Sequence, residues 1–200
     1  MALANEAAGC PADPSVECNE RVYGIKPSSL LTTVHTIVAV CAAPLMPLMG
    51  AMVDYTSHRL LFGRILSMSF LALLFPQIFV SKQTWFALAI VLVVLFFVFI
   101  FQMVAAYAYL PELTTQERQL NNYTRNFTVI TFLVVVVYIA AIVAVTGGLG
   151  IADDAVLVGR IAVIVVFCFA AVTLSLAWGV LFQKRPPLHE LPPGKSLWSA

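Results

Sequence analysis

Charged residues are scarce in this sequence. Only 10% of its 200 residues are Asp, Glu, Lys or Arg, whereas 61% are hydrophobic, and the mean hydropathy is +0.94. Soluble globular domains carry about 25% charged residues, so this composition argues against a soluble domain and predicts an integral membrane protein. The net charge is +1 and no run of Lys and Arg is present, which argues against a nucleic-acid partner.

The residue sets that carry enzymatic or metal chemistry are also lacking. The sequence has no Ser/His/Asp set, no H-E-x-x-H phrase and no pair of carboxylates inside an apolar stretch. No Cys/His cluster has the spacing of metal ligands. We therefore expect a protein that is not an enzyme and that has no metal site and no cofactor.

Five apolar stretches lie between the charged residues: Ser28–Val53, Leu60–Val80, Thr84–Leu110, Phe127–Thr146 and Val156–Phe182. About 20 apolar residues cross a bilayer as a helix, and barrel strands would show an alternating pattern that is missing here. The expected fold class is an all-α integral membrane protein with five transmembrane helices over residues 28–182. A loop segment over 1–27 precedes them, and a Pro-containing linker or tail over 183–200 follows.

The first stretch carries strong local signals. Ser28 and Ser29 follow Pro27 and are expected to cap the helix, and Pro44 and Pro47 are expected to kink its second half.

Two arginines and one polar stretch complete the outline. Arg64 and Arg160 lie near the starts of their helices and are expected to reach back to the membrane surface. Residues Thr114–Asn126 are polar and are expected to form a loop.

The densest polar stretch lies between the first two spans and reads G-x-x-x-D-x-x-x-H-R, with Gly50, Asp54, His58 and Arg59. Asp54 falls at the membrane edge, where a carboxylate can contact a positive helix end or a basic side chain. Such a contact can form in one conformation and break in another, which makes the stretch a candidate conformational hinge. The alternative is that Asp54 and Arg59 only anchor the turn.

A few polar side chains lie inside the apolar stretches. His35 is the titratable residue well within a span, and residues of this kind are functional candidates by default. The alternative is a neutral histidine bonded to one neighbour. Together with Gln102 and Tyr107, His35 is a candidate for lining a water-filled path.

Cys10 and Cys18 lie in the Pro- and Gly-containing N-terminal segment. They are expected to form a disulfide if this side faces an oxidising lumen, and they are free thiols otherwise. Cys41 and Cys168 lie within spans and are expected to act as small apolar residues.

The basic residues are unevenly shared between the two membrane sides. The side with the hinge stretch, the 111–126 loop and the tail holds seven of them, and the other side holds four. The seven are Arg59, Arg64, Arg118, Arg125, Lys184, Arg185 and Lys195, and the four are Arg21, Lys26, Lys82 and Arg160. The positive-inside rule therefore places the hinge stretch and the C-terminus in the cytosol and the N-terminal segment in the lumen. The sequons at Asn122 and Asn126 would then stay unglycosylated.

Three phrases occur in the order seen in one transporter family: GIKPSSL, GAMVDYTSHR and AYLPEL. The second resembles the loop between helices two and three of major facilitator transporters. Gly50, Asp54 and Arg59 agree with that loop, His58 is a weaker base than usual, and Tyr55 and Ser57 depart from it. Over roughly residues 18–180, the sequence resembles the Atg22-like branch of this superfamily, the vacuolar amino-acid effluxers.

The resemblance implies that the five spans correspond to helices two to six of a major facilitator N-terminal bundle, with the hinge stretch acting as a conformer latch. It also implies a fragment or shortened form of a vacuolar membrane transporter that exports amino acids and is linked to autophagy. The alternative is a non-transporting membrane scaffold or regulatory subunit derived from a transporter half. Expected partners are the lipid bilayer, amino acids as small-molecule substrates, and a second copy or a complementing C-terminal half.

Overall fold

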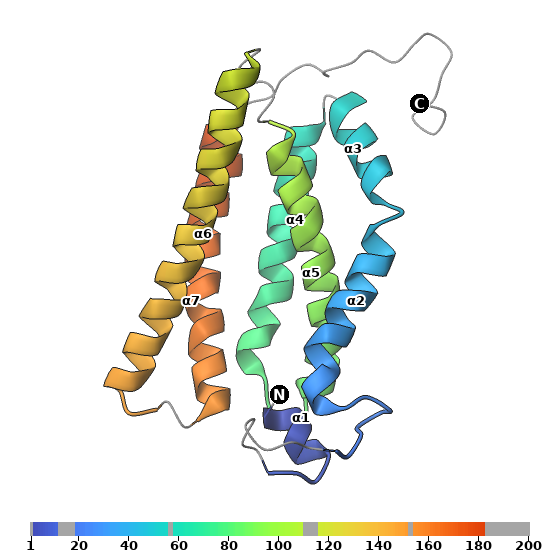
Figure 1. Cartoon of the computed structure of the whole chain (residues 1–200), viewed down its shortest axis with the longest axis vertical. Helices are drawn as coiled ribbons and strands as arrows, with labels where there is room; N and C mark the ends of the chain where they lie inside the picture. Colours follow the sequence, from blue (N-terminus) through green and yellow to red (C-terminus); the bar gives the residue numbers. More distant parts are fainter. Residues whose placement is uncertain (1, 12–18, 56–57, 110–115, 152–153, 183–200) are drawn as a thin grey trace.

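The computed structural model describes residues 2–11, 19–55, 58–109, 116–151 and 154–182. Figure 1 shows long helices packed side by side, with the short helix α1 at one end of the bundle. In chain order the helices are α1 (Ala2–Ala7), η1 (Pro27–Ser29), α2 (Leu30–Ala42), α3 (Met46–Tyr55), α4 (Arg59–Leu74), η2 (Phe75–Phe79), α5 (Trp85–Tyr107), α6 (Glu117–Gly148), α7 (Ala155–Leu176) and η4 (Ala177–Leu181). The elements η1 and η2 are 3₁₀-helices, and η4 is a π-helix.

Within the described part of the chain, four helical segments are long and apolar enough to cross a membrane, and α2 with α3 makes a fifth if that bent pair is one span. The four are Arg59–Phe79, Trp85–Tyr107, Arg118–Gly148 and Ala155–Leu181. Each of the five predicted stretches overlaps one of these segments. The prediction of an all-α integral membrane protein is therefore confirmed.

The first span is broken where its two prolines lie. Residues 43–45 form a turn between α2 and α3, and the two helices are bent by 57°. Proline removes a backbone hydrogen bond and clashes with the preceding turn, so the predicted kink is confirmed. The predicted serine cap is wrong, because the Ser29 hydroxyl donates to the Lys26 carbonyl oxygen at 3.0 Å and does not accept from a helix N–H.

Helix α6 is longer than the sequence indicated. It begins at Glu117 and runs for 32 residues, so most of the loop predicted over Thr114–Asn126 is helical. Polarity was taken as a loop signal, but this stretch has neither Pro nor Gly, and its Glu, Arg, Gln and Leu residues favour helix. The helix ends at Gly148 and is followed by Gly150, whose φ of +66° is a conformation that glycine adopts without steric cost.

The N-terminal segment also contains a helix where a loop was expected. The Ala-rich stretch of α1 favours helix, and α1 packs against α7 at the end of the bundle. The exposed side chains of Glu6 and Lys82 form an ion pair that ties α1 to the turn before α5. We call this the cap end of the molecule.

The buried core lies at the opposite end, where α3 ends and α4 begins, and we call it the motif end. Its buried members are Met49, Leu66, Phe101, Ala105, Tyr109 and Trp178. Helix α4 packs against α5 and α7, and α5 packs against α2. In contrast, α6 lies at the outside of the bundle against α7 (Figure 1).

Candidate functional site

The four residues of the predicted hinge lie around the junction of α3 and α4. Gly50 lies within α3, where an added Cβ would meet no other atom within 4 Å, so close packing does not require this glycine. Asp54 lies in the last turn of α3, and its side chain is outside the described part of the structure. His58 is exposed, whereas Arg59 is buried with 1% of its surface accessible.

Arg59 connects the junction to the end of α5. Its guanidinium carbon lies 5.4 Å from the ring centroid of Tyr109, which is also buried. A cation over an aromatic face is attracted by the ring quadrupole, and a desolvated pair is worth about 2 kcal/mol. The phrases GAMVDYTSHR and AYLPEL, which are far apart in the sequence, therefore meet at the motif end.

Two aromatic side chains from the end of α7 complete this cluster. The ring of Tyr109 lies 4.5 Å from that of Phe182 and 5.9 Å from that of Trp178, measured between centroids. Trp178 and Phe182 lie 4.6 Å from each other. We call Arg59, Tyr109, Trp178 and Phe182 the latch cluster. One of its aromatic pairs is edge-to-face, with an interplanar angle of 74°, and the other two are tilted by 38° and 40°.

Trp178 is held against α4 by a close approach and a hydrogen bond. A Cβ added to Gly63 would lie 2.1 Å from the Cζ3 atom of Trp178, so the indole ring occupies the space that a side chain would need. The neighbouring Arg64 donates from Nε to the Trp178 carbonyl oxygen at 2.8 Å. Arg64 is exposed near the start of α4, and its predicted reach to the membrane surface stays a prediction.

The sequence reasoning missed Gly63, Trp178 and Phe182. A glycine inside a helix often marks a close packing contact, so Gly63 carried a usable signal. Nothing in the local sequence indicates which side chain fills the space beside it. Trp178 lies in the π-helix η4, which packs against α4, and π-type distortions often occur at functional positions.

The three candidate path-lining residues lie in different surroundings. Gln102 on α5 is buried against α4 and donates to the Ser67 hydroxyl at 2.9 Å. Ser67 in turn donates to the Gly63 carbonyl oxygen at 2.8 Å. His35 is exposed on α2, with Nδ1 2.7 Å from the Leu31 carbonyl oxygen and its ring 4.7 Å from that of Phe96.

Tyr107 lies near the end of α5 with 40% of its surface exposed, and its ring centroid is 5.1 Å from that of Phe127 on α6. The structure does not bring these three side chains together. Their role in lining a path stays a prediction.

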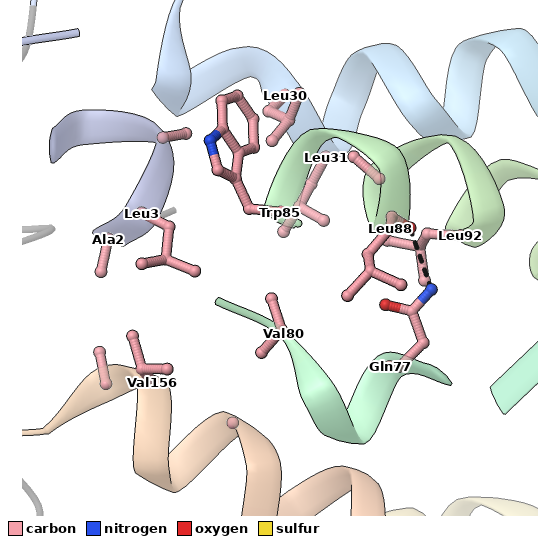
Figure 2. Close-up of a pocket in the computed structure, with 14 residues that line it drawn as sticks. Ala2, Leu3, Leu30, Leu31, Gln77, Val80, Trp85, Leu88, Leu92 and Val156 are labelled. Carbon is pink, nitrogen blue, oxygen red and sulfur yellow. Dashed lines mark hydrogen bonds between the residues drawn. The ribbon is translucent and has the colours of Figure 1, made fainter. Parts of the chain in front are cut away.

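A cavity of about 350 Å³ lies at the cap end (Figure 2). Its walls come from α1, α2, η2, α5 and α7 and are mostly apolar, with Trp85, Val80 and Leu88 among them. Gln77 supplies a polar group and donates from Nε2 to the Leu88 carbonyl oxygen at 3.0 Å.

Two further contacts at this end bear on the sequence predictions. Arg160 donates to the Val80 carbonyl oxygen from Nε at 3.1 Å and from Nη2 at 2.5 Å, and its predicted reach to the membrane surface stays a prediction. Cys10 is disulfide-bonded, and Cys41 and Cys168 are free. Cys18 lies outside the described residues, so its pairing with Cys10 stays a prediction.

The motif end is a site of contact between helices. Its described groups are one buried guanidinium, aromatic rings and helix-end carbonyls. Among the described residues, no group of three His, Cys, Asp or Glu side chains could hold a metal ion. These contacts join the α3–α4 junction, the end of α5 and the end of α7, so the site can report on the relative positions of these helices.

Comparison with known proteins gives one family match. A family model described as "Vacuole effluxer Atg22 like" matches residues 1–129. All three phrases that carry the resemblance fall inside this range, which ends within α6. No curated protein and no solved structure matches the chain.

Proposed function

The chain belongs to the vacuole effluxer Atg22-like family, and we propose that it is part of a transporter that exports amino acids from the vacuole in support of autophagy. The family description supports an effluxer activity and a vacuolar membrane location. The long apolar helices support residence in a membrane. Amino acids are the substrates that the sequence resemblance implies.

The latch cluster is the observation that carries this proposal. Arg59 is buried against Tyr109, and the same ring contacts side chains from the end of α7. A transporter that alternates between two conformations needs contacts that exist in one of them and break in the other. A contact of about 2 kcal/mol biases two conformations by roughly 30-fold, which is enough to favour one without locking it.

Asp54 is proposed to act with this cluster in setting the balance between the two conformations. Asp54 lies in the last turn of α3, five residues before Arg59 in the sequence. In a complete transporter, Asp54→Asn is then expected to slow exchange across the membrane with little change in substrate affinity. An unchanged transport rate would leave Asp54 as an anchor of the turn.

The motif end is proposed to face the cytosol, as the distribution of Lys and Arg suggests. Asn122 and Asn126 lie on the N-terminal part of α6, and both are exposed. On this orientation they stay unglycosylated. A glycosidase-sensitive mass shift at either residue would reverse the orientation.

A non-transporting scaffold or regulatory subunit is the second candidate function, and the exposure of α6 favours it. In the best membrane window of α6, 0% of the residues are buried inside the structure, against 22% for α5. A helix exposed in this way offers a surface for another helix bundle. A second copy of the chain or a complementing bundle is the proposed partner.

The test compares membrane vesicles that contain the chain alone with vesicles that also contain a complementing bundle from a family member. Saturable efflux of labelled amino acids is expected only with the complement. The Arg59→Leu variant is expected to slow that efflux, whereas His58→Gln, at the exposed neighbouring position, serves as the matched control. Correct insertion without efflux in any combination would support the scaffold function.

A further inference from the structure

One short phrase occurs twice in the chain and places an arginine at the same position of two helices. The phrase L-x-G-R-I spans residues 61–65 in α4 and residues 157–161 in α7. Arg64 and Arg160 are each the sixth residue of their helix, and each follows a glycine. Helices α4 and α7 pack against each other.

The two arginines make reciprocal contacts. Arg64 donates to the carbonyl oxygen of Trp178, which lies just beyond α7, and Arg160 donates to the carbonyl oxygen of Val80, which lies just beyond η2 at the end of α4. Each guanidinium therefore satisfies a carbonyl left unpaired at the C-terminal end of the other helix. This exchange makes Trp178 and Val80 equivalent positions, one at each end of the α4–α7 pair.

The side chains at these equivalent positions differ greatly in size. At the motif end, the indole ring of Trp178 fills the space beside Gly63. At the cap end, Val80 is too small to do the same, and a Cβ added to Gly159 would meet no atom within 4 Å. Val80 and Gly159 both line the cavity of about 350 Å³. The cavity is therefore the unfilled equivalent of the space that an indole ring occupies at the other end.

The walls of this cavity suit an aromatic ring with one N–H group. Most of them are apolar, and Trp85 offers an aromatic face. The Leu88 carbonyl can only accept, so the Gln77 atom that faces it must be the amide nitrogen. The Gln77 oxygen is directed into the space between Leu88 and Val80, as Figure 2 shows, where it can accept from a ligand N–H.

The size of the cavity agrees with such a ligand. An apolar cavity of roughly 150 Å³ holds benzene, and this one is about twice as large. It is near the lower limit of ligand pockets, which begin at roughly 300 Å³. Amphipathic rings also concentrate at membrane surfaces, where Trp85 at the start of its span is expected to lie.

We propose that the cavity beside Gly159 is a binding site for a small planar aromatic molecule of the indole class, with its ring between Val80, Gly159 and Trp85 and its N–H on the Gln77 oxygen. The site lies inside the bundle at the cap end, away from the latch cluster. It does not depend on the proposed transport function, because binding can be measured without flux.

The test measures binding of fluoroindole to the purified full chain by fluorine NMR. Saturable binding is expected for the unchanged chain, and Val80→Trp is expected to abolish it by filling the cavity as Trp178 does at the motif end. Val143→Trp, the same change at an exposed position of α6 that does not line the cavity, is the matched control and should keep binding. A raised unfolding midpoint for Val80→Trp would show that the variant folds with its ring inside.

A second comparison tests the N–H contact. Indene has the shape of indole but no N–H, and it is expected to bind about tenfold more weakly, as the loss of one hydrogen bond predicts. Gln77→Leu should remove this difference, whereas Gln83→Leu, at an exposed turn position, should keep it. Unsaturable binding to the unchanged chain, or equal binding by folded Val80→Trp, would overturn the proposal.

Discussion

Helices α4 and α6 are both long and apolar, yet they are packed very differently. In their membrane windows 22% of the α4 residues are buried, against 0% for α6, although α6 has the higher hydropathy. The contacts of α4 come from its small and polar positions: Gly63 admits Trp178, Arg64 binds a carbonyl, and Ser67 pairs with Gln102. Apolarity thus decides that a helix enters the membrane, whereas small and polar residues decide what it packs against.

The largest expected effect concerns the uncovered side of the molecule. Because α6 exposes nearly all of its membrane window, we expect the chain to associate with itself or with a complementing bundle in mild detergent. Liposomes that contain the chain alone are expected to show no saturable amino-acid flux, since alternating access needs two bundles that move against each other.

Cross-linking and flux measurements on the same preparation check this expectation. A leucine-to-alanine change at the exposed Leu133 on α6 should weaken self-association, and the same change at the exposed Leu61 on α4 is the control. Robust saturable flux from monomers would contradict the interpretation that the chain needs a second bundle to transport.

The next largest effect would come from the close approach at Gly63. Gly63→Ala places a methyl group in the space of the Trp178 ring, and we expect a loss of roughly 3 kcal/mol in the free energy of unfolding. Gly159→Ala is the matched control, because its Cβ meets no atom within 4 Å and alanine favours helix. Unfolding in detergent measures the loss of stability for both variants. Equal losses at the two positions would show that the close approach of Trp178 to Gly63 does not contribute to stability.

The sequence predicted the spans and the proline kink, because these depend on local composition and backbone sterics. It did not predict the latch cluster, because Arg59, Tyr109 and Trp178 come from distant parts of the chain and nothing local pairs them. The predicted start of α6 was wrong, because polarity was taken as a loop signal in a stretch that contains good helix formers. His35, Gln102 and Tyr107 were grouped by polarity, whereas their neighbours differ.

A smaller effect is expected from Arg59. Replacing it by leucine removes its interaction with the Tyr109 ring, and we expect a loss of about 2 kcal/mol in stability. The exposed His58, changed to glutamine, should alter stability by less than about 0.5 kcal/mol. Equal losses for both variants would show that burial of Arg59 contributes no more than an exposed position does.

The smallest effect concerns the cap end. Non-reducing peptide mapping is expected to show Cys10 joined to Cys18. Cys10→Ser should speed hydrogen exchange in α1 without lowering the overall unfolding midpoint, because α1 is short and packs at the edge of the bundle. Free thiols at both cysteines after purification without reductant would rule out the disulfide.

The length of α6 has a mechanical consequence. Its 32 residues make a rod of roughly 48 Å, whereas the hydrocarbon core is about 30 Å thick. Tyr138 lies 21 residues from the start of α6 and 10 residues from its end, and its hydroxyl donates to the Ala162 carbonyl oxygen of α7 at 3.1 Å. If this contact acts as a fulcrum, a rotation of 10° moves the N-terminal end of the rod by roughly 5 Å and the C-terminal end by roughly 3 Å in the opposite direction. The polar N-terminal turns of α6 therefore form a lever arm that converts a small tilt inside the membrane into a displacement at its surface.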